Sequence, residues 1–215
     1  MKKLLAEFLG TALLVSIVVG SAFMATDLTQ DAGLQLFINA IATVFGLVVL
    51  ITIFAPISGA HFNPAVTLID FIQGNSSIKT ALQYMIAQIT GAIAGAFLAN
   101  AIFAHPIIQT SSKVRSGQNL YLGEIVATAG LILVIALLVH FKNFSTIPVA
   151  VASWIGTAYF FTSSTSFANP AVTIGRIFTD SAAGIAPACA PKFIAAQILG
   201  SVIALGLVKA LTNDK

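Results

Sequence analysis

Long apolar stretches alternate with short polar segments along the whole chain. A helix needs about 20 mostly apolar residues to cross a hydrocarbon core of roughly 30 Å. Six stretches approach or exceed that length: Leu4–Ala25, Gly33–Ala55, Lys79–Ala104, Leu120–His140, Ile147–Thr162 and Pro191–Leu211. The fifth is short and needs flanking residues to complete it. The pattern predicts an all-α membrane protein, with one domain of six transmembrane helices over residues 1–215.

Two further segments, Phe54–Phe71 and Phe167–Phe178, are too short and too interrupted to cross a membrane. Each has an irregular approach, then Asn-Pro, then residues that suit a helix. Asn is favoured at the N-cap and Pro at the first helical position. We therefore predict that Asn63-Pro64 and Asn169-Pro170 begin two half-helices.

The chain also repeats itself. Three segments recur in the same order: Ala6–Thr11, Phe62–Thr67 and Ile86–Gly91 are matched by Gly123–Thr128, Ala168–Thr173 and Ala195–Gly200. The halves are then about 1–104 and 120–215, with residues 105–119 as a polar linker. Each half holds three spans, an odd number, so the second half is predicted to be an inverted copy of the first. The two half-helices would enter from opposite faces and meet at the midplane.

Irregular backbone at membrane depth is tolerated only where it lines water or is buried in protein. The approach segments can therefore supply a row of pore-lining carbonyls, from Gly59, Ala60, His61, Phe62, Thr165, Phe167 and Ala168. The amides of Asn63 and Asn169 can offer donors at the pore centre. Two half-helix N-termini also place positive dipole ends there, which disfavours cations and protons. This arrangement suits a neutral solute that both donates and accepts hydrogen bonds.

Composition agrees with a membrane protein, because 58% of residues are hydrophobic and only 8% are charged. Soluble domains are nearer a quarter charged. The net charge of +3 is spread without a basic cluster, so no nucleic-acid partner is expected. The three histidines (His61, His105 and His140) lack metal-ligand spacing, which predicts no metal site, and nothing indicates a cofactor. The single cysteine, Cys189, excludes an internal disulfide.

The basic residues suggest an orientation. If both termini are cytoplasmic, Lys2, Lys3, Lys79, Lys142, Lys209 and Lys215 lie inside, and Lys113, Arg115, Arg176 and Lys192 lie outside. This is a weak positive-inside bias. A cleaved signal peptide is the alternative for the first stretch. Glu7 within that stretch, and its repeat at Glu124, argue against it.

These residues resemble the major intrinsic protein family, the aquaporins and aquaglyceroporins. Ile57–Thr67 is very close to the first signature of the family, and the resemblance covers nearly the whole chain. It implies that Asn63-Pro64-Ala65 and Asn169-Pro170-Ala171 form the centre of the pore. It also implies that Glu7 and Glu124 are buried and hold the pore loops. A homotetramer in a lipid bilayer, with one pore per subunit, follows from the same resemblance. The short termini are typical of a bacterial inner-membrane form.

The second signature departs from the family pattern. Most members have Asn-Pro-Ala-Arg, with the arginine in the narrowest part of the pore, whereas this chain has Val172. Spacing from the asparagines assigns the selectivity filter to Thr43, Thr157, Ser166 and Val172. A two-residue gap would place Phe45 there instead of Thr43. Without a charge or an aromatic ring, this filter would be wide enough for small polyols, urea-like molecules or neutral metalloid acids.

Asp70 and Arg176 each lie seven residues after a signature asparagine. The inverted repeat places Asp70 near the inner pore mouth and Arg176 near the outer one. Each residue is either a half-helix end that reaches interfacial water, or, in the case of Arg176, a partial replacement for the missing filter arginine one turn further out.

Three other functions agree less well with the sequence. A secondary transporter also uses inverted repeats and broken helices, but Glu7 and Glu124, its candidate coupling groups, are already assigned as loop anchors. A membrane enzyme would need a nucleophile–base pair or a phosphate loop, and neither is found. An ion channel would need a charged ring or a filter motif. The sequence therefore predicts a passive, proton-excluding channel for water, small neutral solutes or both.

Overall fold

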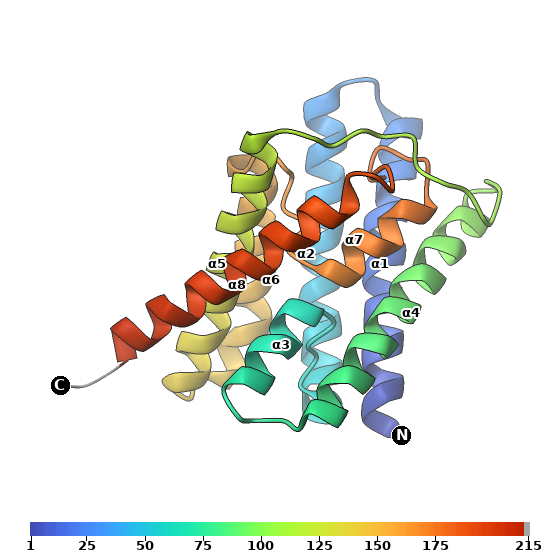
Figure 1. Ribbon diagram of the computed structural model, residues 1–215. Helices are drawn as coiled ribbons and strands as arrows, with labels where there is room; N and C mark the ends of the chain where they lie inside the picture. Colours follow the sequence, from blue (N-terminus) through green and yellow to red (C-terminus); the bar gives the residue numbers. More distant parts are fainter. Residues whose placement is uncertain (213–215) are drawn as a thin grey trace.

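The computed structural model describes residues 1–212 and consists of helices joined by loops (Figure 1). The α-helices are α1 (Lys2–Leu28), α2 (Ala32–Ser58), α3 (Pro64–Ile72), α4 (Ile78–Ile102), α5 (Gln118–His140), α6 (Ile147–Phe161), α7 (Pro170–Gly175) and α8 (Ala190–Thr212). Two short 3₁₀ helices, η1 (Phe144–Thr146) and η2 (Arg176–Phe178), precede α6 and follow α7. Within residues 1–212 there is no β-strand, so the all-α prediction is confirmed.

Six helices are long and apolar enough to cross a membrane, as predicted. The predicted spans end within three residues of the observed helices. The short fifth span is completed by η1, which extends the crossing segment to Phe144–Phe161. α3 has nine residues and a length of roughly 14 Å, about half of the hydrocarbon core.

One boundary differs from the prediction. The irregular approach to Asn63 was expected to start near Pro56, but α2 continues through Pro56 to Ser58. Proline is tolerated here because it sits in the last turn, where it removes a single helical hydrogen bond. Gly59 then ends the helix in the left-handed conformation, with φ of 93°. The approach segment is therefore only the four residues before Asn63.

The long helices form two groups with the half-helices between them. α1 packs mainly against α4 and α2, while α5 packs mainly against α8 and α6. α3 contacts α4 and α8, and α7 contacts the same two helices from the other end of the bundle (Figure 1). Glycine permits the closest crossings. A Cβ atom at Gly91 would overlap the carbonyl of Phe8, and one at Gly200 would overlap the carbonyl of Ile125.

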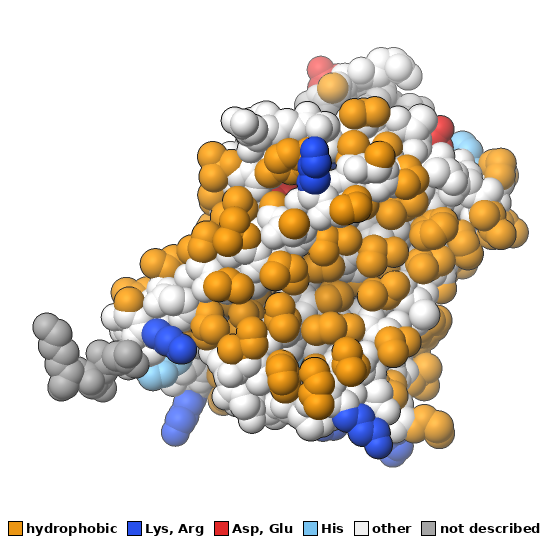
Figure 2. Space-filling view, in the orientation of Figure 1, with side chains coloured by type: hydrophobic (Ala, Val, Ile, Leu, Met, Phe, Trp, Pro, Cys, Tyr) orange, Lys and Arg blue, Asp and Glu red, His pale blue; other side chains and the backbone are white. Residues whose placement is uncertain are grey.

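Apolar side chains cover the middle of the molecule and charged side chains lie mostly toward its two ends (Figure 2). We call the end that holds Met1 and Thr212 the N-terminal face, and the other end the opposite face. α3 lies in the half next to the N-terminal face, and α7 lies in the half next to the opposite face (Figure 1). Lys215 falls outside the described residues.

Candidate pore

The first half-helix is held by the carboxylate of Glu7, which is fully buried in α1. Its Oε1 accepts hydrogen bonds from the Ser58 hydroxyl at 2.6 Å and the His61 N–H at 3.0 Å. Its Oε2 accepts from the Phe62 N–H at 2.7 Å and the Gln88 amide at 2.8 Å. Four donors thus satisfy this carboxylate, as burial at membrane depth requires.

The second half-helix has a matching support in Glu124, fully buried in α5. Its carboxylate accepts from the N–H groups of Phe167 and Ala168, both at 2.9 Å, and from the Gln197 amide at 2.6 Å. Gln197 also donates to the Thr173 hydroxyl at 2.9 Å. The segments recognised as repeats in the sequence therefore make equivalent contacts.

Both approach segments adopt left-handed backbone at non-glycine residues. The φ angles are 51° at Ala60 and 50° at Phe62, and 51° at Ser166 and 49° at Ala168. Such a conformation costs an L-residue roughly 1–2 kcal/mol. The two glutamates bind the N–H groups of the neighbouring residues, so their hydrogen bonds hold the segments in this shape and offset the cost.

The two signature asparagines lock the halves together. Asn63 Nδ2 donates to the Ala168 carbonyl, and Asn169 Nδ2 donates to the Phe62 carbonyl, both at 2.8 Å. Each side-chain oxygen caps its own half-helix, by accepting from the N–H of Ala65 or of Ala171 at 2.9 Å. Because a primary amide has two N–H bonds, each asparagine retains one after this lock.

A cavity of about 1310 Å³ runs past both asparagines. It is far larger than the share of roughly 30 Å³ that one water occupies in the liquid, so it is a passage rather than a packing defect. Its lining includes apolar side chains, among them Leu14, Leu47, Ile155 and Val172. Several approach residues line it as well, namely Gly59, Ala60, His61, Phe62, Ser166, Phe167 and Ala168. Thr165, predicted to contribute a carbonyl, does not line it.

The cavity reaches one face of the molecule, and its lining stops short of the other at what we call the closed end. It reaches the N-terminal face at Asp70, His140 and Lys209. Toward the opposite face it ends at Thr43, Tyr159 and Arg176, and its lining includes no residue of the described loops 29–31, 105–117 and 179–189. Thr43 and Tyr159 share a hydroxyl–hydroxyl hydrogen bond of 3.2 Å at this end.

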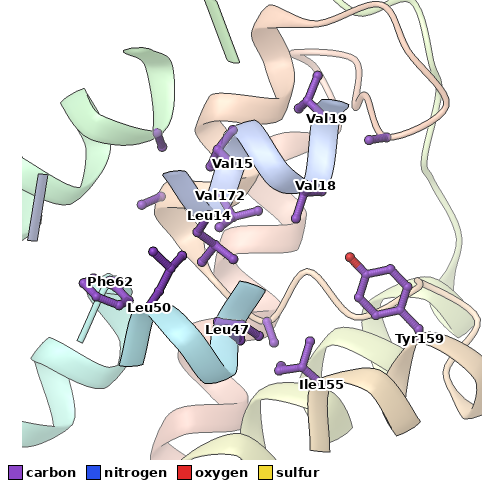
Figure 3. Close-up of a cluster of buried hydrophobic side chains, with 14 of the residues drawn as sticks. Leu14, Val15, Val18, Val19, Leu47, Leu50, Phe62, Ile155, Tyr159 and Val172 are labelled. Atoms are coloured by element: carbon purple, nitrogen blue, oxygen red, sulfur yellow. The ribbon is translucent and has the colours of Figure 1, made fainter. Parts of the chain in front are cut away.

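The structure places three of the four predicted filter residues at that closed end. Thr43, Ser166 and Val172 are buried and line the cavity. The alternative to Thr43 is wrong, because Phe45 is 65% exposed on the outside of α2. Figure 3 shows Val172 beside Leu14 and Val15, and the Tyr159 ring nearby. Ser166 Oγ is buried without a hydrogen-bond partner among the described residues.

The assignment of Thr157 is wrong. Thr157 is exposed and does not line the cavity, whereas Tyr159, two residues further along α6, is buried and does. A two-residue shift turns a helical side chain by about 200°, to the other side of the helix. The expectation of a filter without an aromatic ring fails with it. No sequence motif marked Tyr159, but the buried face of α6 also contains Ile155 and Ala158, and that face could have pointed to it.

The sequence left two environments open for Arg176, interfacial water or the position of the missing filter arginine, and the first is wrong. It does not reach interfacial water, because only 3% of its surface is exposed. Its Nε donates to the Ala183 carbonyl, and its guanidinium carbon lies 3.3 Å from the centroid of the Phe167 ring. The side chain lines the closed end of the cavity, one turn beyond Val172.

The end of the cavity at the N-terminal face is polar. Asp70 is partly exposed and lines both the main cavity and a smaller one of about 460 Å³ beside it. His61 lies between these cavities, with Nδ1 3.1 Å from the Thr67 hydroxyl and its ring edge-on to Tyr84. No cluster of metal-ligating side chains occurs in the described part of the chain.

Comparison with known proteins gives consistent relatives. The family profile described as Major intrinsic protein matches residues 1–166. The chain is 47% identical over 210 residues to the aquaglyceroporin AqpS of Rhizobium meliloti (strain 1021), covering 98% of this chain and 90% of the relative. It is 35% identical over 187 residues to the aquaporin TIP1-1 of Arabidopsis thaliana, covering 81% and 74%.

The fold has a solved counterpart in the aquaglyceroporin from Plasmodium falciparum. The two share a TM-score of 0.73 at 22% identity, over 98% of this chain and 96% of that one. The family profile and the bacterial relative both cover most of the chain, and the helices agree with the solved fold. This chain is therefore an integral membrane protein that belongs to the major intrinsic protein family of channels, and it is not an enzyme.

Proposed function

We propose that this chain is a passive, proton-excluding pore for water and small neutral solutes. The observation that carries the proposal is the mixed lining of the main cavity. Leu14, Leu47 and Ile155 line it with apolar side chains, and the approach segments and the two signature asparagines line it with residues that have hydrogen-bond acceptors and donors. A small solute with hydroxyl or amide groups and a short apolar part fits such a passage.

The charge pattern along the cavity supports a neutral solute. Glu7 and Glu124 are fully engaged with their loops, so neither is free to couple transport to an ion. Both asparagines line the cavity, and the second N–H of each amide can donate a hydrogen bond to a solute but cannot accept a proton. Both facts favour passive flow over secondary transport, and exclusion of protons over their relay.

The proposed solutes are small polyols, urea-like molecules and neutral metalloid acids, with water. Val172 supports this width, because its side chain is short and uncharged at the level where Thr43 and Ser166 line the cavity. The name of the bacterial relative, an aquaglyceroporin, agrees with the polyol class. Tyr159 and Arg176 also line this end of the cavity, where the Tyr159 hydroxyl is hydrogen-bonded to Thr43.

The assembly and orientation are part of the same proposal. The chain would form a homotetramer of separate pores in a lipid bilayer, and its many exposed leucine, isoleucine and phenylalanine side chains support burial in lipid or between subunits. The equivalent supports at Glu7 and Glu124 favour an inverted repeat of residues 1–104 and 120–215. Lysines at the N-terminal face favour a cytoplasmic location for both termini, in a bacterial inner membrane.

The test is flux through the purified protein in liposomes. Water, glycerol, urea and arsenous acid are offered in turn, with light scattering as the readout and protein-free liposomes as the control. We expect water and at least one of the other solutes to cross faster than through bare lipid, without saturation. An internal pH-sensitive dye measures protons in parallel. Neutral flux equal to that of bare lipid, or a proton leak comparable with water flux, would reject the proposal.

A further inference from the structure

Two guanidinium groups from distant parts of the chain lie on one aromatic ring at the closed end of the cavity. The Arg176 carbon is 3.3 Å from the Phe167 ring centroid, and the Arg115 carbon is 5.0 Å from it. Arg115 comes from the loop between α4 and α5, and Arg176 comes from η2. We call Arg115, Arg176 and Phe167 the ring cluster.

The cluster is fixed to a single short loop. Arg176 Nε donates to Ala183, and Arg115 donates to the carbonyls of Gly184 at 2.8 Å and Ala182 at 3.0 Å. The Lys113 amine also donates to the Ala182 carbonyl, at 2.8 Å. Three consecutive carbonyls therefore hold three cations.

Carbonyl dipoles orient these cations but do not neutralise them. Glu124, a nearby carboxylate on α5, already accepts from Phe167, Ala168 and Gln197. Asp180 lies on the same loop as the three carbonyls, and its carboxylate accepts from the N–H and the hydroxyl of Ser112. Burial and the charges of Arg115 and Arg176 lower the pKa of Lys113. Three cations against two carboxylates leave this end of the cavity with a net positive charge.

Arg176 is the member of the cluster that faces the solute path. It lines the main cavity, and among residues 1–212 its hydrogen bonds use only Nε, which leaves its two terminal nitrogens without a protein partner. Val172, one turn inward, lines the same cavity and brings no charge. Width at the Val172 level and charge at the Arg176 level are thus set by different residues.

We infer that the channel sorts solutes in two separable steps, by size at Val172 and by charge at the ring cluster. A cation that has room to pass Val172 is stopped at Arg176, where the net positive charge of a poorly solvated site repels it. A neutral solute of the same size passes both. This inference rests on the proposed function, and it adds Arg176, Arg115 and Phe167 as the residues that determine charge specificity.

Urea and guanidinium are the matched probes, because they are planar molecules of nearly the same size that differ in charge. Radiolabelled uptake of both, with water and glycerol flux alongside, is measured in liposomes containing the wild type, Arg176→Gln or Arg176→Lys. We expect Arg176→Gln to admit guanidinium at least tenfold faster than the wild type, with the glycerol-to-water ratio unchanged. Arg176→Lys keeps the charge and should keep the exclusion.

The complementary variant is Val172→Phe, which adds bulk without charge. It should lower glycerol flux relative to water at least tenfold and leave guanidinium flux at the wild-type level. If Arg176→Gln does not fold, the Arg115→Gln variant tests the charge step instead, because Arg115 contacts the same Phe167 ring from a loop. Its guanidinium flux should then rise at least threefold.

The outcomes separate the two hypotheses. A wild type that conducts no neutral solute rejects the proposed function. A wild type that conducts glycerol or urea, while guanidinium stays excluded in the folded Arg176→Gln and Arg115→Gln variants, rejects only the charge step. Guanidinium entry through Val172→Phe, or a changed glycerol-to-water ratio in Arg176→Gln, rejects the separation of the two steps.

Discussion

The two half-helices are supported alike but end differently. Glu7 and Glu124 each bind the two N–H groups that precede a signature asparagine, and each is braced by a glutamine from another helix. Seven residues past the asparagines the likeness stops. Asp70 is partly exposed at a polar mouth, whereas Arg176 is buried on an aromatic ring. The comparison shows that the repeated segments around the two asparagines build the centre of the pore. Residues just beyond those segments, Asp70 and Arg176, distinguish its two ends.

The largest expected effect tests whether the two supports are equal. Glu7→Gln and Glu124→Gln each place an amide N–H₂ against main-chain donors, and breaking a buried charged network costs about 3–5 kcal/mol. We expect both variants to lose yield and thermal stability in detergent, Glu7→Gln more so, because Glu7 accepts four hydrogen bonds and Glu124 three. Solute ranking should not change; a new ranking at normal expression would contradict the anchor role.

Val172→Arg sharpens the difference between the two ends. A guanidinium at this position would narrow the cavity beside Thr43 and Ser166, close to the charge of Arg176. Glycerol flux should fall at least tenfold relative to water, equivalent to about 1.4 kcal/mol of added barrier. Liposome light scattering gives the ratio for variant and wild type. An unchanged or higher ratio in a well-folded protein would mean that solutes are not sorted at residue 172.

Loss of either signature asparagine should destabilise the protein by a similar amount. Asn63→Ala and Asn169→Ala each remove a helix cap and one cross-link, for a loss of about 1–2 kcal/mol in stability. Thermal unfolding in detergent gives the comparison. A much larger effect of one variant would show that the centre is less symmetric than its hydrogen bonds indicate.

The smallest effect distinguishes the two faces of α6. Tyr159→Phe removes the hydroxyl that bonds Thr43 at the closed end, so glycerol and water flux should change by a few fold, equivalent to about 0.5–1 kcal/mol. Thr157→Val is the matched control on the exposed face and should change neither flux. An equal effect of both substitutions would return Thr157 to the solute path.

The sequence predicted the parts of this fold that depend on local pattern. Hydropathy located six spans to within three residues, and the family resemblance pointed to Glu7 and Glu124 as the two supports. The residue of α6 that lines the cavity could not be identified by counting back from Asn169, which gave Thr157 in place of Tyr159. The irregular residues between α6 and α7 include left-handed backbone, so they do not carry a helical phase across the gap.

Burial of Arg176 was equally out of reach. It depends on the loops that contain Arg115 and Ala183, which have no periodic pattern and lie far apart from each other in the sequence. Phe167, two residues before Asn169, was a usable signal, since guanidinium groups pack favourably on aromatic rings. The glutamines of the third repeated segment were a second signal, because a buried amide repeated at one position implies a repeated partner.

The asparagine lock also has a consequence for the order in which the chain can fold during synthesis. The partner of the Asn63 amide is the carbonyl of Ala168, 105 residues later in the chain. At synthesis rates of about 5–20 residues per second, the first half-helix must wait roughly 5–20 s for that carbonyl to be made. During this interval the first loop can be held by Glu7 and by Tyr84 and Gln88, which are all synthesised once the third crossing is complete. The buried carboxylate of the first half therefore serves the nascent chain as a temporary brace, before it serves the finished channel.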